Sequence, residues 1–189
     1  MLHFFPTSFP DETLYSRMAR YHRLSGHKCD RTSLLELIGR HTHVITSGLP
    51  SSLATLISNM PAEEEPPTVA DVVESNTIFP CFRAFMPEDR RAKLLAAMSG
   101  ESAAGLKMYL GLVASRLGAK NHLRLCRSCV AADEATTGQP YWHRVHQLPG
   151  VWICPNHDEP LFVLDSHIAH LKRLNLLLPD DSLIHQHAC

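Results

Sequence analysis

A chain of 189 residues with 44% hydrophobic side chains is long enough to bury a core as one domain or two small ones. Its 18 basic and 19 acidic residues nearly cancel, which argues against charge-driven disorder and against a uniformly basic nucleic-acid coat. No apolar run of about 18 residues is present to span a bilayer, and residues 1–5 lack the basic segment and long apolar stretch of an export leader. We therefore expect a cytoplasmic protein without membrane association.

Residues 1–60 are predicted to form an N-terminal arm and a bundle of short helices. Residues 4–10 mix aromatic side chains with proline, which favours an extended arm packed down by its rings. Asp11 is predicted to cap the first helix. The apolar residues of this helix recur at spacings of three and four until Gly26, which is predicted to end it.

A second and a third helix follow at once. Residues 31–33 predict an N-cap and Gly39 a stop for the second helix, and residues 49–57 predict the third, which Pro61 ends. Two short helices across a glycine-containing turn are typical of a helix-turn-helix, although any small helical bundle contains such pairs. Reading of DNA by this pair is thus one hypothesis beside a purely structural role.

Residues 61–122 are predicted to begin with an exposed linker and to continue as helices. An aromatic and proline-rich element at residues 77–82 is expected to return to the core. Residues 88–99 and 106–117 predict two helices whose leucines and methionines face inward and whose basic residues face outward.

The charge is segregated along the chain, and residues 83–127 are the candidate for binding an anion. This segment holds nine basic residues against three acidic ones. The alternative is a solvated helical face that the acidic residues 61–82 neutralise. The candidate nucleic-acid contacts are Arg83, Arg90, Arg91, Lys93, Lys107, Arg116, Lys120, Arg124 and Arg127.

A candidate metal-binding motif begins at Cys126, where the sequence runs Cys-x2-Cys, then 24 residues, then Cys-x2-His. The four side chains are those of Cys126, Cys129, Cys154 and His157. Two residues between ligands let one tight turn point both side chains at a single ion, and zinc takes four thiolate or imidazole ligands in a tetrahedron. The pattern predicts one structural Zn²⁺. Reduced buried cysteines without a metal are the alternative, and a catalytic zinc is disfavoured because four protein ligands leave no position for a substrate.

The Cys-x2-Cys and Cys-x2-His pairs are here called the two knuckles. The residues between them predict the hairpin of a zinc ribbon. Residues 141–147 and 151–154 have strand character around a Pro-Gly turn. Trp142 and Trp152 are expected to bury against the ribbon and the preceding helices.

His143 or His146 could be a spare ligand, but a hydrogen-bonding role behind the ligands is favoured. Among the other cysteines, Cys81 is predicted in the core, and Cys29 and Cys189 are predicted as surface thiols.

The expected fold is mainly α, with an N-terminal bundle resembling a helix-turn-helix and a zinc-finger module that contains a small β-hairpin. Its predicted segments are residues 1–60, 61–122, 123–165 and a C-terminal helix or tail at 166–189. No phosphate loop, nucleophile elbow or dinucleotide fingerprint occurs, so we expect no enzymatic activity.

Several segments together resemble the TniQ/TnsD family of transposon target-selection proteins, in order as well as in content. The resemblance covers roughly residues 4–165 and is closest in the predicted ribbon. The matching residues are Phe5-Pro6-Thr7, Pro10-Asp11-Glu12, Leu14-Tyr15-Ser16, Ala19-Arg20, Gly26, Thr77-Ile78-Phe79-Pro80, Ala114-Ser115-Arg116, Cys126, Cys129, Tyr141-Trp142-His143-Arg144, His146-Gln147-Leu148-Pro149-Gly150, Cys154-Pro155 and His157. Arg127 departs from the proline common after the first ligand.

The resemblance implies a bacterial, non-catalytic adaptor in DNA transposition. Such an adaptor couples a target-recognition element, either DNA or a guide-RNA effector complex of a CRISPR-associated transposon, to an AAA+ (TnsC-like) transposition regulator. It also implies that the basic segment and the ribbon touch nucleic acid. Long family members continue well beyond the second knuckle. A short member that relies on other subunits is therefore expected, with a truncated long member as the alternative, and whether two copies pair is left open.

A second interpretation comes from a different class of protein, a stand-alone zinc-ribbon regulator that binds nucleic acid. Binding to an ATPase separates the two. Tight binding to nucleic acid without contact to an ATPase would favour the regulator.

Overall fold

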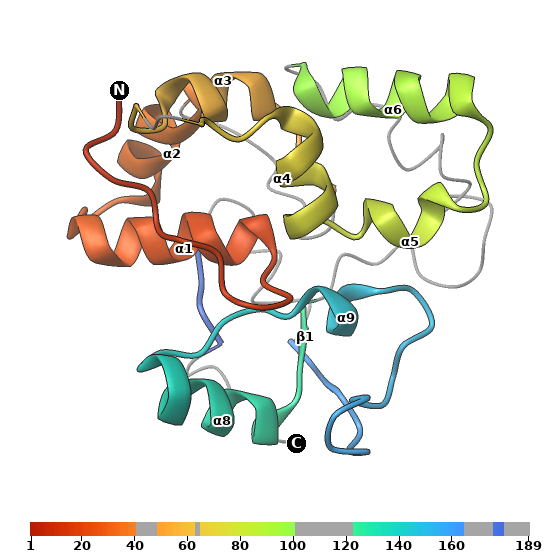
Figure 1. Cartoon of the computed structure of the whole chain (residues 1–189). Coiled ribbons are helices and arrows are strands. Elements are labelled where there is room, and N and C mark those ends of the chain that lie inside the picture. The colour runs from red at the N-terminus through yellow and green to blue at the C-terminus, as the bar shows by residue number, and fades with distance from the viewer. Residues whose placement is uncertain (41–48, 63–64, 101–122, 165–175, 180–189) are drawn as a thin grey trace.

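The computed structural model describes residues 1–40, 49–62, 65–100, 123–164 and 176–179. Over these residues the chain is mostly helical and carries one two-stranded antiparallel sheet, as the sequence predicts (Figure 1). The helices of the first hundred residues lie on one side of the molecule, and the cysteine-containing module lies on the other. Within the described part, no helix has both the length and the hydropathy needed to cross a membrane.

Helices α1 (Leu14–Ser25) and α2 (Asp30–Ile38) follow the N-terminal arm and end where the glycines predict. Gly26 and Gly39 adopt left-handed φ values of +68° and +71°, which glycine reaches without a Cβ clash. The two helices contact each other. Use of this pair to read DNA stays a prediction.

The cap predicted for α1 is wrong. Thr13, not Asp11, is the N-cap, and its Oγ1 accepts the Ser16 amide hydrogen at 3.1 Å. Asp11 instead has φ +55°, and its carboxylate points to the cysteine-containing module. There it accepts hydrogen bonds from the backbone amide of Val145 at 3.0 Å and from Arg144 Nε at 3.1 Å. A local pattern cannot show that a distant segment competes for this side chain.

The next four helices complete the N-terminal half. They are α3 (Leu53–Asn59), α4 (Val69–Asn76), α5 (Phe79–Arg83) and α6 (Glu88–Ser99). Helix α4 opens with a reciprocal capping box between Thr68 and Asp71. Helix α6 has the predicted bounds and buries Leu94 and Met98 completely. The helix predicted at 106–117 lies outside the described residues.

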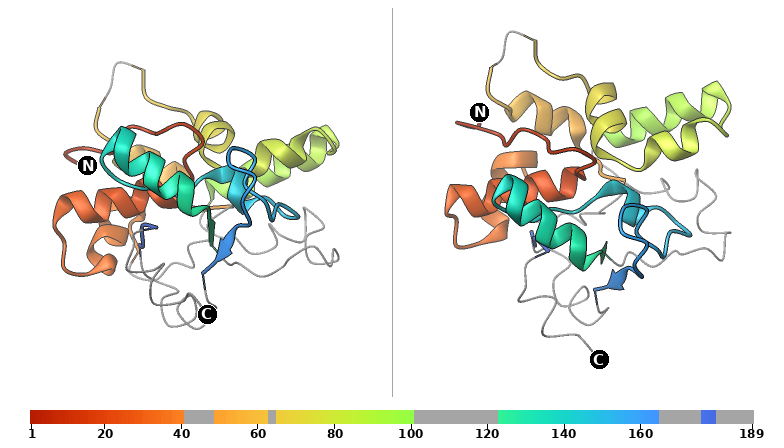
Figure 2. Two further views of the ribbon diagram at one scale, coloured as in Figure 1. Left: turned by 90° about the horizontal axis from the view of Figure 1, so that it is seen from below. Right: turned by 60° about the horizontal axis from the view of Figure 1, so that its bottom comes forward.

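The module contains α8 (Arg127–Thr137), α9 (Arg144–Gln147) and the strands β1 (Arg124–Leu125) and β2 (Phe162–Val163). The strands pair Arg124 with Val163 and Leu125 with Phe162, and thus join the two ends of the module. Seen from below in Figure 2, α8 lies in front of α1.

The hairpin predicted within the module is wrong in its position. Residues 144–147 form helix α9, and in residues 151–154 only Ile153 makes a bridge, to Pro160. The backbone around Trp142 pairs with the start of α1 instead: Thr13 N donates to Trp142 O at 2.9 Å, and Trp142 N donates to Ser16 Oγ at 3.1 Å. The strand-like composition of residues 141–147 therefore reflects packing against another segment.

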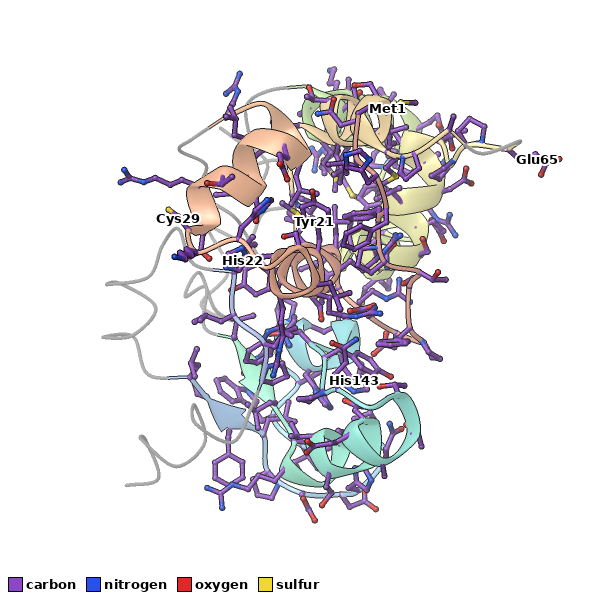
Figure 3. All side chains as sticks on the ribbon, turned by 90° about the vertical axis from the view of Figure 1, so that its left-hand side faces the viewer. Met1, Tyr21, His22, Cys29, Glu65 and His143 are labelled. Carbon is purple, nitrogen blue, oxygen red and sulfur yellow. The ribbon has the colours of Figure 1, made fainter. Side chains whose placement is uncertain are left out.

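One hydrophobic core joins the two halves. Trp142 is fully buried in the same cluster as Leu14, Leu34 and Leu94, which come from α1, α2 and α6. Figure 3 shows His143 on the module's side of α1 and Tyr21 on the opposite side. A second, small cluster within the module consists of three cysteines and Leu161.

Candidate metal centre

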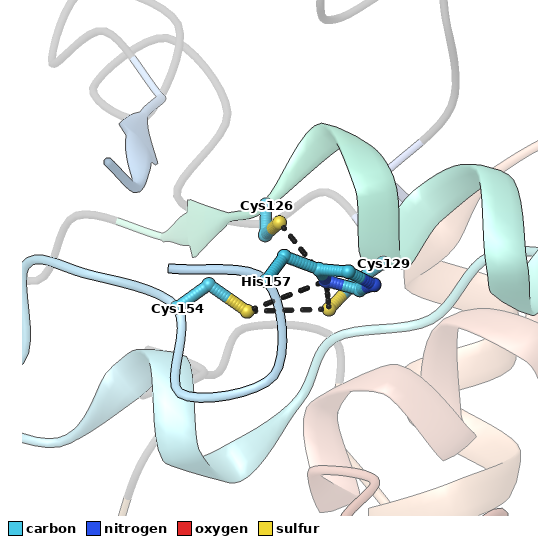
Figure 4. Close-up of side chains that lie close together, drawn as sticks. All are labelled: Cys126, Cys129, Cys154 and His157. Atoms are coloured by element: carbon cyan, nitrogen blue, oxygen red, sulfur yellow. Dashed lines mark hydrogen bonds between the residues drawn. The ribbon is translucent and has the colours of Figure 1, made fainter. Parts of the chain in front are cut away.

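The four predicted ligands come together where α8 begins and in the turn after residue 153 (Figure 4). Their sulfur atoms and one ring nitrogen all lie within 4.8 Å of one another. Cys129 Sγ is 3.6 Å from Cys154 Sγ and 3.3 Å from His157 Nδ1. The same Nδ1 lies 3.6 Å from the sulfur atoms of both Cys126 and Cys154. The three cysteines are buried, and the histidine is exposed.

These separations fit one tetrahedral zinc. Zn–S bonds of about 2.3 Å and Zn–N bonds of about 2.0 to 2.1 Å, at tetrahedral angles, put two sulfurs about 3.8 Å apart and a sulfur and a nitrogen about 3.6 Å apart. The observed sulfur–sulfur distance of 3.6 Å and sulfur–nitrogen distances of 3.3 to 3.6 Å lie close to these values. The cluster could therefore hold one metal ion.

Backbone turns position both halves of the cluster. Cys126 is the N-cap of α8 and Cys129 lies in its first turn, where the partial positive charge of a helix N-terminus favours thiolates. On the other side, Cys154 N donates to Glu159 O at 2.8 Å and Asp158 N donates to Cys154 O at 2.9 Å. Asp158 has φ +54°, which lets this loop turn tightly enough to bring His157 beside Cys154.

Burial and hydrogen bonding together set the pKa values of the three thiols. It raises the pKa values of Cys126 and Cys129, and neighbouring thiol groups raise them further. Burial also opposes ionisation of Cys154, but hydrogen bonds from the backbone of Asn156 and from His157 lower the pKa of this thiol to about 7. The positive charge of a bound dication would stabilise three adjacent buried thiolates. Ionised thiols at this site are therefore most stable as metal ligands.

His143, His146 and Trp142, for which the sequence suggests a structural role, are all buried. His146 is 1% exposed, and its Nε2 lies 3.8 Å from Cys129 Sγ. Burial lowers the pKa of His146 to about 4, with His143 and Arg124 adding to the effect, so its ring is neutral at neutral pH. His143 Nε2 lies 2.9 Å from Asp133 Oδ2, and the Trp142 indole donates to Leu177 O at 2.6 Å. These contacts suit the structural role that the sequence suggests for the three side chains.

Sequence reasoning missed Glu159, which links the two halves of the cluster. Ser128 Oγ, between the first two cysteines, lies 2.8 Å from both carboxylate oxygens of Glu159. One of these oxygens is 3.6 Å from Cys126 Sγ. Hydrogen bonding to Ser128 lowers the pKa of Glu159, which keeps the carboxylate charged. The only sequence signal for Glu159 was its closeness to the predicted ligands. Ser128 lies between Cys126 and Cys129, and Glu159 lies two residues after His157.

Replacing Glu159 with glutamine is expected to weaken metal binding about 10- to 100-fold, the usual effect of losing a group that supports the ligands. Glutamine keeps an oxygen for Ser128 but removes the negative charge that favours a cation beside Cys126. Competition with a zinc chelator measures the affinity. Glu134→Gln on the exposed surface of α8 is the charge-matched control, and equal affinities of the two variants would contradict the role of Glu159.

Six of the nine predicted nucleic-acid contacts lie in the described residues, and most already have partners. Arg83 pairs with Glu74 at 2.7 Å, and on α6 Lys93 lies 3.8 Å from Asp89 while Arg91 pairs with Glu88. Arg90 and Arg127 are exposed.

Arg124 is 9% exposed, and its guanidinium donates to Val151 O and Leu148 O. It lies inside the module and serves its folding. Lys107, Arg116 and Lys120 lie outside the described residues.

Two predictions about burial are wrong. Cys81 lies exposed on α5, because the neighbouring Phe79 takes the core position on this short helix. Trp152 is 59% exposed, since its segment forms the outer side of the module while Trp142 packs against α1. Cys29 is exposed, as predicted, and Cys189 lies outside the described residues.

Comparisons with known proteins agree on one family. The family model TniQ matches residues 3–161. The Transposon Tn7 transposition protein TnsD of Escherichia coli is 29% identical to this chain over 166 residues, which is 86% of the chain. The chain spans about a third, 32%, of the length of that relative.

Proposed function

This chain belongs to the TniQ family, and on that premise we propose that it is a non-catalytic adaptor that takes part in selecting the target of DNA transposition. The family match over residues 3–161 carries the proposal, because it includes both the N-terminal helices and the four residues of the candidate metal centre. In the proposal the protein links a target-recognition element, either DNA or a guide-RNA effector complex, to an AAA+ regulator.

A single structural zinc ion fits this role. The cluster offers three thiolates and one imidazole, which is a complete tetrahedral shell, so an ion bound there has no open position for a substrate. The ion would hold the start of α8 to the turn at residues 154–158. It would shape a binding module and supply no reaction chemistry.

The coupling between the two halves also supports an adaptor. Arg144 joins them at three points: its backbone amide donates to Asp11 O at 2.7 Å, its Nε donates to the Asp11 carboxylate, and its Nη1 donates to Glu74 O at 2.7 Å. A partner bound to the zinc module is thus held in a set orientation to one bound on the helices.

The exposed side of α6 is the described surface that best suits a polyanion. Its ion pairs within the helix are solvent-exposed pairs of the kind that contribute about 0 to 1 kcal/mol, so phosphates can replace the carboxylates at little cost. Arg90 adds an exposed cation on the same helix.

We expect reversal of Arg90, Arg91 and Lys93 to glutamate to weaken binding to DNA and to guide RNA at all sequences without unfolding the protein. Each lost phosphate contact should lower the slope of log affinity against log salt by about 0.9 on duplex DNA. Binding isotherms over a salt series measure both quantities, with circular dichroism as the folding control. Unchanged affinity and slope would show that this face of α6 is solvated and does not contact nucleic acid.

The bridging function is tested with the same variant. The wild-type protein should retain the ATP-bound regulator of its own transposon on immobilised target DNA or effector complex, and the charge-reversed variant should bind the regulator but fail to bridge. Tight nucleic-acid binding by a protein that never contacts the ATPase would instead favour a stand-alone zinc-ribbon regulator.

A further inference from the structure

Helix α9 lies between the N-terminal half and the strand β1 (Figure 1), and His146 brings this helix into contact with the candidate metal centre. The His146 ring is 1% exposed, and its Nε2 lies 3.8 Å from Cys129 Sγ. A cysteine that binds a metal is a thiolate, which can only accept hydrogen bonds. Nε2 therefore carries the hydrogen that faces this sulfur, in the neutral as well as in the charged ring.

Other contacts fix α9 on two sides. Gln147 Nε2 donates to Arg124 O at 2.8 Å, and Gln147 Oε1 accepts from Arg124 N at 3.1 Å. These two bonds join α9 to β1, which leads directly into the first knuckle. On the other side, the Asp11 carboxylate accepts from Val145 N at 3.0 Å, and Asp11 O accepts from Arg144 N at 2.7 Å.

These contacts decide where α9 lies. The helix has four residues, which are too few to be stable without outside contacts. Its single turn contacts Cys129 through His146 and the residues before α1 through Asp11. A change that releases the turn on one side therefore also weakens its hold on the other side.

We propose that His146 is a positioning residue of the metal centre, which donates from Nε2 to the Cys129 sulfur, and that α9 thereby couples metal binding to the contact with Asp11. The donated hydrogen bond would orient the sulfur and draw off part of its negative charge, as groups that support metal ligands do. The coupling is reciprocal, so a bound metal should stabilise the Asp11 contact by the same factor by which that contact strengthens metal binding. It requires the metal centre but not the adaptor function.

Titration of the full chain with Co²⁺, followed by competition with Zn²⁺, tests the role of His146. His146→Leu removes the donor but keeps an apolar volume, and it should weaken the binding of both metals at least about tenfold. His146→Gln keeps a side-chain N–H and should restore most of the affinity. His22→Leu is the matched control, since this ring contacts Asp30 and Ser33 between α1 and α2, and it should leave the affinity unchanged.

The absorption spectrum of the Co²⁺-loaded protein separates a hydrogen bond to the sulfur from mere filling of space. Loss of the donor raises the electron density on the sulfur, so the sulfur-to-cobalt band should move to longer wavelength in His146→Leu and stay in place in His146→Gln. The visible d–d bands should stay unchanged in both variants, because the four ligands are the same.

Asp11→Ala tests the coupling from outside the metal centre. It should weaken metal binding about fivefold, the lower end of the usual coupling between two sites. Combined with His146→Leu it should add little, because the connection through α9 is already broken. Asp89→Ala removes an exposed carboxylate from α6 and should leave the affinity unchanged.

The remaining outcomes overturn the inference. Leucine and glutamine variants that bind metal equally well, with native circular dichroism, would show that the hydrogen bond has no role, and altered d–d bands would make His146 a ligand. If His146→Leu does not fold, His146→Asn, whose amide stops short of the sulfur, replaces it. Wild-type affinity in Asp11→Ala, or the same loss with and without His146, would refute the coupling. A wild-type protein that takes up no Co²⁺ would instead refute the metal centre itself.

Discussion

Replacing Cys154 with serine is expected to abolish metal binding and to unfold the module formed by residues 123–164. Cys154 is fully buried and lies within 3.6 Å of both Cys129 Sγ and His157 Nδ1. Structural zinc contributes about 10 to 16 kcal/mol in small modules at neutral pH. That is comparable to the 5 to 15 kcal/mol that typically stabilises a whole domain, so loss of the ion is expected to unfold the module.

The matched control is Cys81→Ser, which makes the same change at an exposed cysteine on α5 outside the cluster. Elemental analysis should give about one zinc per chain for the wild type and for the control, and well under one for Cys154→Ser. Circular dichroism should show loss of helix in that variant and in the wild type after chelation. A Cys154→Ser protein with native helical content and full metal would refute the metal centre.

Replacing Trp142 with alanine is expected to cost about 3 to 5 kcal/mol of the free energy of unfolding, the usual cost of removing a buried tryptophan. Its side chain is fully buried in the shared core, and its indole donates to Leu177 O at 2.6 Å. Because its neighbours come from helices of the N-terminal half, the loss should destabilise both halves together. Denaturant unfolding followed by circular dichroism measures the shift in midpoint.

Trp152→Ala is the control for this experiment, since it removes the same side chain at an exposed position. It should cost about 0.5 kcal/mol or less. The chain has two tryptophans, so each variant leaves one fluorophore. Separate unfolding transitions for the two halves in the wild type, or equal destabilisation by the two variants, would contradict a single shared core.

The candidate metal centre was predictable because its chemistry is local. Two ligands three positions apart reach one ion from a single turn wherever that turn lies, so the spacing alone selects four residues, and the structure brings those four together. Helix ends at Gly26 and Gly39 were predictable for the same reason, since a left-handed residue ends a helix without help from distant contacts.

The errors have the opposite cause. Asp11, Cys81 and residues 141–147 each have a plausible local role, but a distant segment decides the outcome in two of them. The Asp11 carboxylate accepts hydrogen bonds from α9 rather than capping α1, and residues 141–147 pair with the start of α1 rather than with a neighbouring strand. For Cys81, a short helix has room to bury only some of its apolar residues.

By itself, the sequence determined the helical class, the four residues of the candidate metal centre and the family, because these depend on spacings along the chain and on residue types. Only the tertiary structure decided that Trp142 is buried while Trp152 is exposed, that Arg124 lies inside the module, and that Glu159 lies beside Cys126. Such outcomes depend on which distant segments meet, from 33 positions between Cys126 and Glu159 to 126 between Ser16 and Trp142. The local periodicity of apolar residues does not specify which distant segments pack together, because many arrangements bury the same apolar residues.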